Sequence, residues 1–206
     1  MRVPCLLLLA VPIALLGCSH KSPVRNDHPI IRQDYRDADN VIPTDPGAPL
    51  FTRLGTKIVA PDGHQVTLAE LTKATGTASL WCDSAGTHAE LHLTGLIPKG
   101  IYTVFNAVPN PESPQNLAIG PVGASDGRDS VFKASASGQA DITAVTPPGP
   151  LGTRGGMPSC ALTDLRALNL ECGYHIDGQT YGPNPAPRGR GAAVQIVQLM
   201  FEFTFK

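Results

Sequence analysis

The sequence has little charge, few aromatic residues and no apolar segment long enough to cross a membrane as a helix. Charged residues make up 16% of the 206 positions and aromatic residues 5%, and the formal net charge is −1. A chain this close to neutrality has no basic surface for nucleic acid, so we expect no nucleic-acid partner. The sequence also lacks an internal repeat and a sustained helical period, which argues against solenoids and helical bundles.

Glycine and proline are abundant, with 21 and 20 residues. This share stays below the range of disordered polymers. Short strands joined by glycine- and proline-containing turns fit such a composition better than helices do. With 42% hydrophobic residues, the chain is long enough for one well-buried domain with appendages.

The first 17 residues have the features of a secretory signal peptide. Arg2 is followed by an apolar run from Leu6 to Leu16, which at about a dozen residues is too short to span a bilayer. Where this run ends, Leu15-Leu16-Gly17-Cys18 resembles a bacterial lipobox. The resemblance implies that Cys18 carries lipid and becomes the mature N-terminus, which would anchor the protein stably to a membrane. The alternative is a plain secretory signal that contains a cysteine.

Residues 18–50 are predicted to form a flexible tether between the lipid and the domain. The segment is rich in Asp, Asn and Arg, and repeated X-Pro pairs interrupt any regular element. Ser19, directly after Cys18, favours the outer membrane of the bacterial cell envelope. The folded domain is then expected to cover residues 51–206.

Residues 86–108, GTHAELHLTGLIPKGIYTVFNAV, are predicted to form two strands around a tight turn. Polar and apolar residues alternate from His88 to Leu93, which is typical of a strand with one buried face. Leu96 to Gly100 supplies the turn, and Tyr102 follows it. This spacing resembles the tyrosine corner of Greek-key sandwiches, in which a tyrosine hydroxyl bonds back to nearby backbone.

Further strands are predicted wherever alternating apolar residues lie between turn residues: 77–82, 130–136, 140–145, 168–176 and 197–205. In the last of these, alternation from Val197 through Phe201 to Phe205 predicts one buried face. Thr67-x-x-Glu70 is a capping box and predicts a helix over 68–74. Residues 110–121 are expected to form a long Greek-key connection.

The predicted fold class is therefore all-β. We expect a Greek-key β-sandwich, immunoglobulin-like or fibronectin III-like, with one short helix near residues 68–74. The stretches GTHAELHLTGLIPKGIYTV and YHIDGQTYGP together resemble a family of secreted bacterial and archaeal β-sandwich domains. The resemblance implies no activity and assigns no site residues.

Three cysteines remain outside the signal and the lipidation site, and an oxidising compartment favours one disulfide and one thiol. Cys82 and Cys160 lie beside loops, whereas Cys172 lies in an apolar stripe. We expect a disulfide between Cys82 and Cys160, with Cys160–Cys172 as the alternative.

The candidate ligand-binding residues are His88, His92, His175 and Asp177. His175 and Asp177 face the same way at a loop edge, and with His92 on an adjacent strand they would form a polar patch for a metal or a sugar. His88 and His92 lie about 13 Å apart along one strand, at about 3.3 Å per residue, so they cannot share an ion. A solvated strand face and a hydrogen-bonded turn are the structural alternatives.

Residues 123–127, Gly-Ala-Ser-Asp-Gly, match the Gly-x-Ser-x-Gly pattern of α/β-hydrolases. The chemistry of Ser125 would need a strand before it and a helix after it. The surrounding sequence predicts a turn between β elements instead, so an esterase is disfavoured.

The sequence as a whole predicts a lipid-anchored envelope or surface lipoprotein with a non-enzymatic binding or structural domain. The expected partners are the membrane, through Cys18, and an envelope protein or a glycan; no cofactor is expected. The alternative is a copper- or zinc-dependent redox or hydrolytic protein that uses His92, His175 and Asp177.

Overall fold

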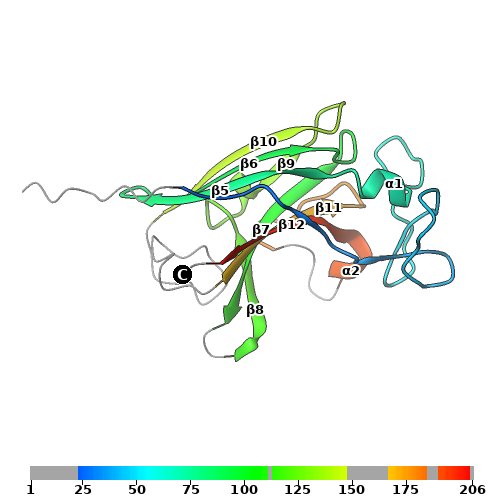
Figure 1. The fold of residues 1–206 in the computed structure, drawn as a ribbon, viewed down its shortest axis with the longest axis horizontal. Helices are drawn as coiled ribbons and strands as arrows, with labels where there is room; N and C mark the ends of the chain where they lie inside the picture. The colour runs from blue at the N-terminus through cyan, green and yellow to red at the C-terminus, as the bar shows by residue number, and fades with distance from the viewer. Residues whose placement is uncertain (1–22, 111–112, 148–166, 185–189, 205–206) are drawn as a thin grey trace, which may run out of the picture.

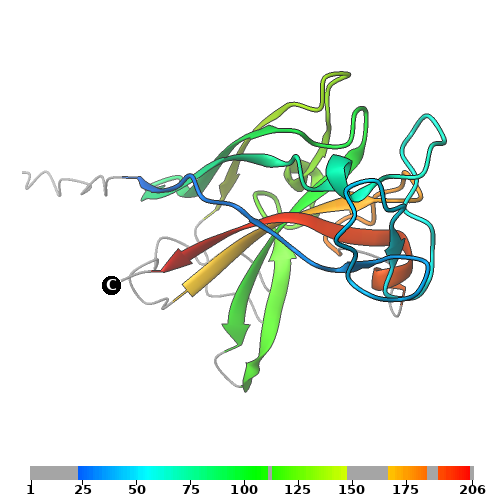
Figure 2. The same ribbon diagram turned by 45° about the vertical axis from the view of Figure 1, so that its right-hand side comes forward.

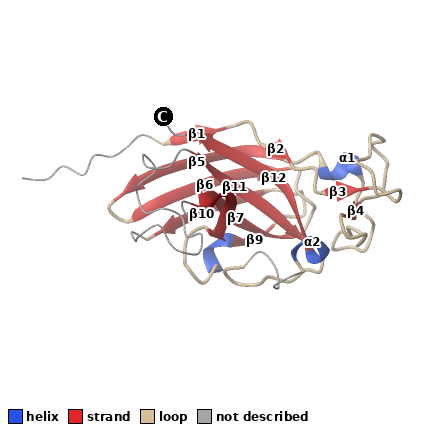
Figure 3. Cartoon of the chain, turned by 90° about the horizontal axis from the view of Figure 1, so that it is seen from below, coloured by secondary structure: helices blue, strands red, loops and turns tan. Residues whose placement is uncertain are grey.

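Two antiparallel sheets pack face to face in the computed structural model, which describes residues 23–110, 113–147, 167–184 and 190–204 (Figures 1, 2 and 3). The four-stranded sheet has the order β1 (Val24–Asn26), β5 (Thr75–Asp83), β6 (Gly86–Thr94) and β10 (Ala140–Thr146). The six-stranded sheet has the order β2 (Ile30–Ile31), β12 (Gln195–Thr204), β11 (Ala167–His175), β7 (Ile101–Asn110) and β8 (Ser113–Pro121), with β9 (Val131–Lys133) also paired to β7. A two-stranded sheet pairs β3 (Tyr35–Arg36) with β4 (Phe51–Thr52).

The connections between the sheets confirm the predicted sandwich. The chain leaves the β5–β6 hairpin and crosses to the other sheet as β7, and β10 later returns to pair with β6. β11 then crosses back to pair with β7. These interlocked crossings are a Greek-key arrangement, in which the inner faces of both sheets bury one shared set of apolar side chains.

The core follows the alternation seen in the sequence. On the four-stranded sheet, Leu80, Leu91 and Leu93 point inward and are at most 2% exposed. On the six-stranded sheet, Leu170 and Phe201 are fully buried opposite them. Because successive strand residues point to opposite faces, each strand gives every second side chain to this core.

Tyr102 forms the predicted tyrosine corner. Its hydroxyl accepts a hydrogen bond from the backbone N–H of Ile97 at 2.8 Å and donates one to Gln198 Oε1 at 2.6 Å. The Gln198 amide in turn donates to the carbonyl of Leu71 at 2.9 Å. One buried chain of hydrogen bonds thus ties the β6–β7 turn to β12 and to the short helix α1 (Leu68–Leu71).

The capping box of α1 is also confirmed. Thr67 Oγ1 accepts from the Glu70 N–H at 3.4 Å, and Glu70 Oε2 accepts from the Thr67 N–H at 2.8 Å. The helix ends at Leu71, earlier than predicted.

Two short elements, the 3-10 turn Arg128–Ser130 and helix α2 (Gly191–Val194), were not predicted. Within the ranges that the structure describes, no helix is long and apolar enough to cross a membrane.

The described part of the segment predicted as a tether contains three short strands, β1, β2 and β3. β1 pairs with β5, and β2 pairs with β12. Tyr35 and Leu50 are buried in the shared core at 4% and 0% exposure. The sandwich therefore includes residues before position 51. Short edge strands need only backbone hydrogen bonds to an open sheet edge, so they leave no apolar period in the sequence.

The predicted Greek-key connection over residues 110–121 is wrong, because β8 forms a hairpin with β7 over much of this stretch.

The prediction for the last strand is wrong at Val197. A bulge opposite Cys172 and Gly173 pairs these residues with Leu199 and Val197, so Gln198 is the extra residue. Val197 therefore lies on the outer face, while Ile196 is 3% exposed in the core.

Candidate functional site

His88 and His92 lie on the outer face of the four-stranded sheet, as their alternation predicts. The His88 ring stacks on the Trp81 ring of the neighbouring strand, with centroids 4.8 Å apart and planes at 12°. His88 Nε2 lies 2.8 Å from Asp83 Oδ1. The His88 side chain is thus held between an aromatic ring and a carboxylate.

His92 pairs with acidic side chains on its own strand and on β10. Its Nδ1 lies 2.7 Å from Asp141 Oδ1, and its Nε2 lies 3.4 Å from Glu90 Oε1. The hydrogen bond to Asp141 raises the pKa of His92 above its ordinary value, and the charge of Glu90 adds to this. The residue is exposed and forms part of a solvated polar face.

His175 lies in the other sheet, at the end of β11, and is 1% exposed. Its Nε2 lies 2.7 Å from Thr103 Oγ1 on β7. Burial lowers the pKa of His175, and the nearby charge of Asp177 opposes this only in part. His175 Nδ1 is buried without a hydrogen-bond partner among the described residues. The imidazole is therefore neutral at pH 7.

Asp177 bonds within its own loop and not to His175. Its Oδ1 accepts from the Gln179 N–H at 3.1 Å, and its Oδ2 accepts from the Tyr181 hydroxyl. The bond to Asp177 raises the pKa of Tyr181. The Tyr181 ring lies over His175, with centroids 5.9 Å apart. This loop is a hydrogen-bonded turn, and Tyr181, which the sequence interpretation left out, is its central side chain.

The predicted patch of His92, His175 and Asp177 does not form, because His92 belongs to β6 and His175 to β11 in the opposite sheet. Alternation along a strand shows which face a residue is on, but not which sheet the strand joins. No group of three or more His, Cys, Asp or Glu side chains suited to a metal ion occurs among the described residues.

Acid should destabilise the fold through His175. A pKa that is lower in the folded state than the ordinary value of about 6.5 means that the unfolded chain binds the proton more readily. The stability contributed by the neutral imidazole is complete above pH 6.5 and is lost as the pH falls toward the folded-state pKa. Each unit by which burial lowers the pKa is equivalent to about 1.4 kcal/mol.

Urea unfolding at pH 8 and pH 5 of the native protein and of His175→Asn measures this effect. We expect the native protein to lose more stability between the two pH values than the variant does, because asparagine does not titrate. His64 and His92, whose raised pKa values act in the opposite direction, are common to both proteins and cancel in the comparison. An equal loss in the two proteins would contradict a buried, neutral His175.

Ser125 lies in an exposed turn between β8 and the 3-10 turn Arg128–Ser130. Gly123 and Gly127 have φ angles of 85° and 81°, and Asp129 Oδ2 accepts from the Ala124 N–H at 2.9 Å. A three-residue 3-10 turn takes the place of the helix that a nucleophile elbow needs. The Gly-x-Ser-x-Gly match is therefore a turn, as its surroundings predict.

Cys82 and Cys172 are both buried free thiols. Cys82 Sγ lies 3.5 Å from Thr87 Oγ1, and burial raises the pKa of Cys172 far above its ordinary value. The predicted Cys82–Cys160 disulfide and its alternative Cys160–Cys172 are therefore wrong, because both described partners are free thiols. Cys160 and Cys18 themselves lie outside the described residues, and the lipidation of Cys18 stays a prediction.

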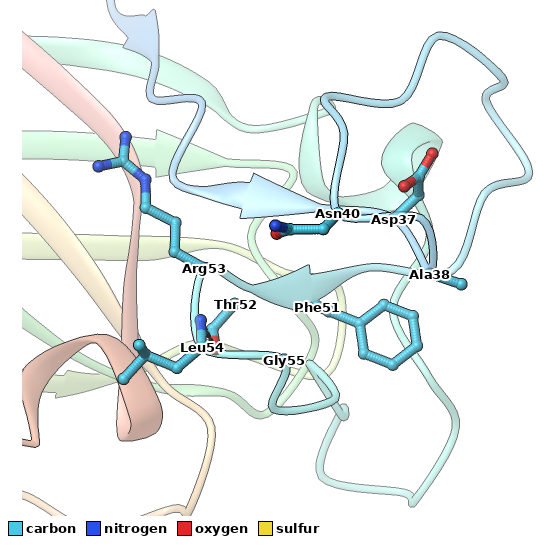
Figure 4. Close-up of a pocket in the computed structure, with 8 residues that line it drawn as sticks. All are labelled: Asp37, Ala38, Asn40, Phe51, Thr52, Arg53, Leu54 and Gly55. Carbon is cyan, nitrogen blue, oxygen red and sulfur yellow. Dashed lines mark hydrogen bonds between the residues drawn. The ribbon is translucent and has the colours of Figure 1, made fainter.

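A groove that the sequence did not predict lies at the end of the sandwich that carries β3 and β4 (Figure 4). It encloses about 550 Å³ and is lined by Asp37, Ala38, Asn40, Phe51, Thr52, Arg53, Leu54 and Gly55. Figure 4 shows Asp37, Ala38 and Phe51 toward one end of the groove and Arg53 and Leu54 toward the other.

Short-range hydrogen bonds hold the two loops of the groove. Asp37 Oδ1 accepts from the N–H groups of Asp39 and Val41 at 2.9 and 3.1 Å. Thr52 Oγ1 accepts from the N–H groups of Leu54 and Thr56, both at 3.2 Å. An ion pair of 2.8 Å between Arg53 Nη2 and Asp34 Oδ1 fixes the guanidinium beside the groove. Hydrogen bonds within each loop thus hold the backbone that lines the groove.

The most exposed large apolar side chains of the described residues lie on these same loops. Leu54 is 66% exposed, Val41 54% and Ile42 44%. The sequence signal for them is weak, because Leu54 and the pair Val41-Ile42 are isolated apolar residues in polar loops that have no periodicity. Leu54 lines the groove itself, and Val41 and Ile42 directly follow the lining residue Asn40 in the chain.

Comparisons with known protein families, with curated proteins and with solved structures find no match to the chain.

Proposed function

We propose that this protein is a lipid-anchored envelope lipoprotein whose β-sandwich is a non-enzymatic binding domain. The anchor is proposed from the Leu-Leu-Gly-Cys18 sequence at the end of the apolar N-terminal run. The observation that supports binding best is the groove between residues 37–40 and 51–55, with the exposed apolar side chains around it.

The chemistry of the groove favours a protein partner over a glycan. Leu54, Val41 and Ile42 are aliphatic and well exposed, and aliphatic side chains contribute most when they insert into a complementary apolar surface. Asp37 and the ion-paired Arg53 line the same groove as Leu54 and add polar groups to it. Exposed apolar side chains mixed with polar ones, arginine among them, are usual in protein–protein interfaces.

Site-specific crosslinking in the source cells tests this proposal. A photoreactive amino acid at position 54 of the full-length chain should give an adduct with one protein of discrete mass. The same amino acid at Thr143, exposed on the outer face of β10, is the control and should give none. Adducts of equal yield and mass at both positions would contradict a specific groove.

Two isoleucines of equal exposure provide a matched pair of variants. Ile42, two residues after the groove-lining Asn40, is 44% exposed, and Ile119 on β8 is 43% exposed. Ile42→Ser should reduce the adduct at position 54 about tenfold, which corresponds to about 1.4 kcal/mol at a central contact. Ile119→Ser should leave the yield unchanged. Equal losses in both variants would contradict the assignment of the groove.

Other outcomes would point to other functions. Binding of a purified glycan, abolished by Phe51→Ala, would replace the protein partner with a sugar. Stoichiometric copper or zinc in the purified protein, lost in His175→Asn, would favour the metal-dependent alternative. A mature N-terminus without acyl mass on Cys18 would remove the lipid anchor.

A further inference from the structure

The register of β1 determines which end of the domain lies nearest to the proposed lipid anchor. Val24, the first residue of β1, pairs with Leu80 of β5, and the two strands are antiparallel. Val24, at the start of β1, therefore lies toward the end of the sheet where the β5–β6 hairpin turns, between Asp83 and Gly86 (Figures 1 and 2). Cys18 is six residues before Val24, and at about 3.6 Å per residue this length of chain can span at most about 22 Å.

Trp81 lies at this same end of the domain. It is the single tryptophan in the chain and follows Leu80 by one residue toward the hairpin turn. Its side chain is on the outer face of the sheet and partly exposed, with His88 stacked on it at 4.8 Å. Tryptophan prefers the boundary between lipid and water, because its ring is apolar while its indole N–H needs a polar partner.

The charges around Trp81 suit a neutral membrane surface. The Asp83 carboxylate lies 2.8 Å from His88 Nε2, and Arg25 is exposed on the adjacent strand β1. Together with the net charge of −1, these groups give no strong attraction to, or repulsion from, a zwitterionic headgroup layer.

We propose that the tip of the β5–β6 hairpin rests on the bilayer that holds Cys18, with the Trp81 indole in the headgroup layer. This proposal depends on the lipid anchor of the proposed function and adds to it an orientation of the domain. Once Cys18 is in the membrane, the added contact costs little entropy, because the short connection already holds the hairpin close to the surface.

The orientation places the groove away from the membrane. β5 has nine residues and spans about 30 Å at about 3.3 Å per residue. α1, β3 and β4 lie toward its opposite end, with the groove loops (Figure 3). The groove would then face the envelope space, where a protein partner can reach it.

Because Trp81 is the only tryptophan in the sequence, tryptophan fluorescence reports the contact of this residue with the membrane alone. The full-length chain, produced in a bacterial host that processes lipoproteins, is reconstituted into phosphatidylcholine vesicles with or without bromine-labelled acyl chains, which quench tryptophan on contact. We expect a loss of fluorescence and a blue shift of the emission in the brominated vesicles. Acrylamide quenching should fall on vesicle binding.

The control moves the tryptophan to the groove end, in the double variant Trp81→Phe with Leu54→Trp. Leu54 is 66% exposed, so the new indole is accessible and the fold is not disturbed. Bromine-labelled lipid should leave its fluorescence unchanged. Equal quenching at both positions, or none at Trp81, would overturn the proposed orientation.

Flotation of the same vesicles separates this proposal from the anchor itself. A protein that floats with the vesicles but whose Trp81 is not quenched keeps the anchor and loses the orientation. A full-length protein that does not float contradicts the anchor and the orientation together. Cys18→Ser should not float, and its Trp81 should remain unquenched, since the hairpin contact alone is too small to hold the domain on the bilayer.

Discussion

Replacing Tyr102 with phenylalanine should lower the free energy of unfolding by about 2–4 kcal/mol. The Tyr102 hydroxyl satisfies two buried groups at once, the N–H of Ile97 and the Oε1 of Gln198. Without it, both remain in the core with no partner, and each such loss costs about 1–3 kcal/mol. The ring itself is retained, so its contacts with Phe132 and Tyr174, at 5.1 and 5.3 Å between centroids, do not change.

Urea unfolding of the variant measures this loss, with Tyr35→Phe as the matched control. Tyr35 is 4% exposed, and its hydroxyl has no hydrogen bond within the described residues, so removing it should change stability by less than about 0.5 kcal/mol. A loss for Tyr102→Phe no larger than that of the control would contradict the hydrogen-bonded corner.

Gln198→Leu extends the test to the other end of the chain of hydrogen bonds. This variant also removes the bond from the Gln198 amide to the Leu71 carbonyl. The double variant with Tyr102→Phe should be less destabilised than the sum of the two single variants, because the bond between the two side chains is lost only once. Strict additivity would show that the two residues do not interact.

The tyrosine corner shows which part of this fold a sequence can predict. The turn and Tyr102 are only a few residues apart, so their spacing alone specifies the bond from the Ile97 N–H. Gln198 is 96 positions away, and no local pattern connects it to Tyr102. The strands and the capping box likewise depend on residues that are close together in the sequence, and these are the features that the sequence predicts correctly.

The candidate site was harder to predict, because its residues also come together through contacts between distant parts of the sequence. Alternation places His88, His92 and His175 correctly on strand faces, but the pairing of β6 and β11 with different sheets depends on contacts across the whole chain. The groove is formed by loops whose residues have no periodicity. Asp37 and Thr52 do carry a local signal, since each bonds backbone N–H groups two and four residues ahead. That signal predicts a turn and not a cavity.

The bulge in β12 explains why a regular pattern gave the wrong face for one residue. An extra residue in one strand sets two successive side chains on the same face. Gln198 and Leu199 are both fully buried, and before them the alternation is reversed. The amide that completes the tyrosine corner is therefore the bulged residue itself, and its bond to the Leu71 carbonyl links β12 to α1.

Ile196→Ala should destabilise the domain by about 2–4 kcal/mol, and Val197→Ala by about 1 kcal/mol or less. Ile196 is 3% exposed within the core, so its truncation removes apolar contacts and leaves a cavity. Val197 is only partly buried on the outer face of the sheet, where solvent and neighbouring side chains adjust more easily.

Chemical unfolding of the two variants decides between the two registers of β12. An unbroken alternation from residue 197 to 205 requires the reverse order, with Val197→Ala the more damaging change, because Val197 would then be the core residue. The ratio of the two losses therefore tests the position of the bulge. If Val197→Ala costs more, Gln198 cannot face the core, and its hydrogen bonds with Tyr102 and Leu71 are contradicted as well.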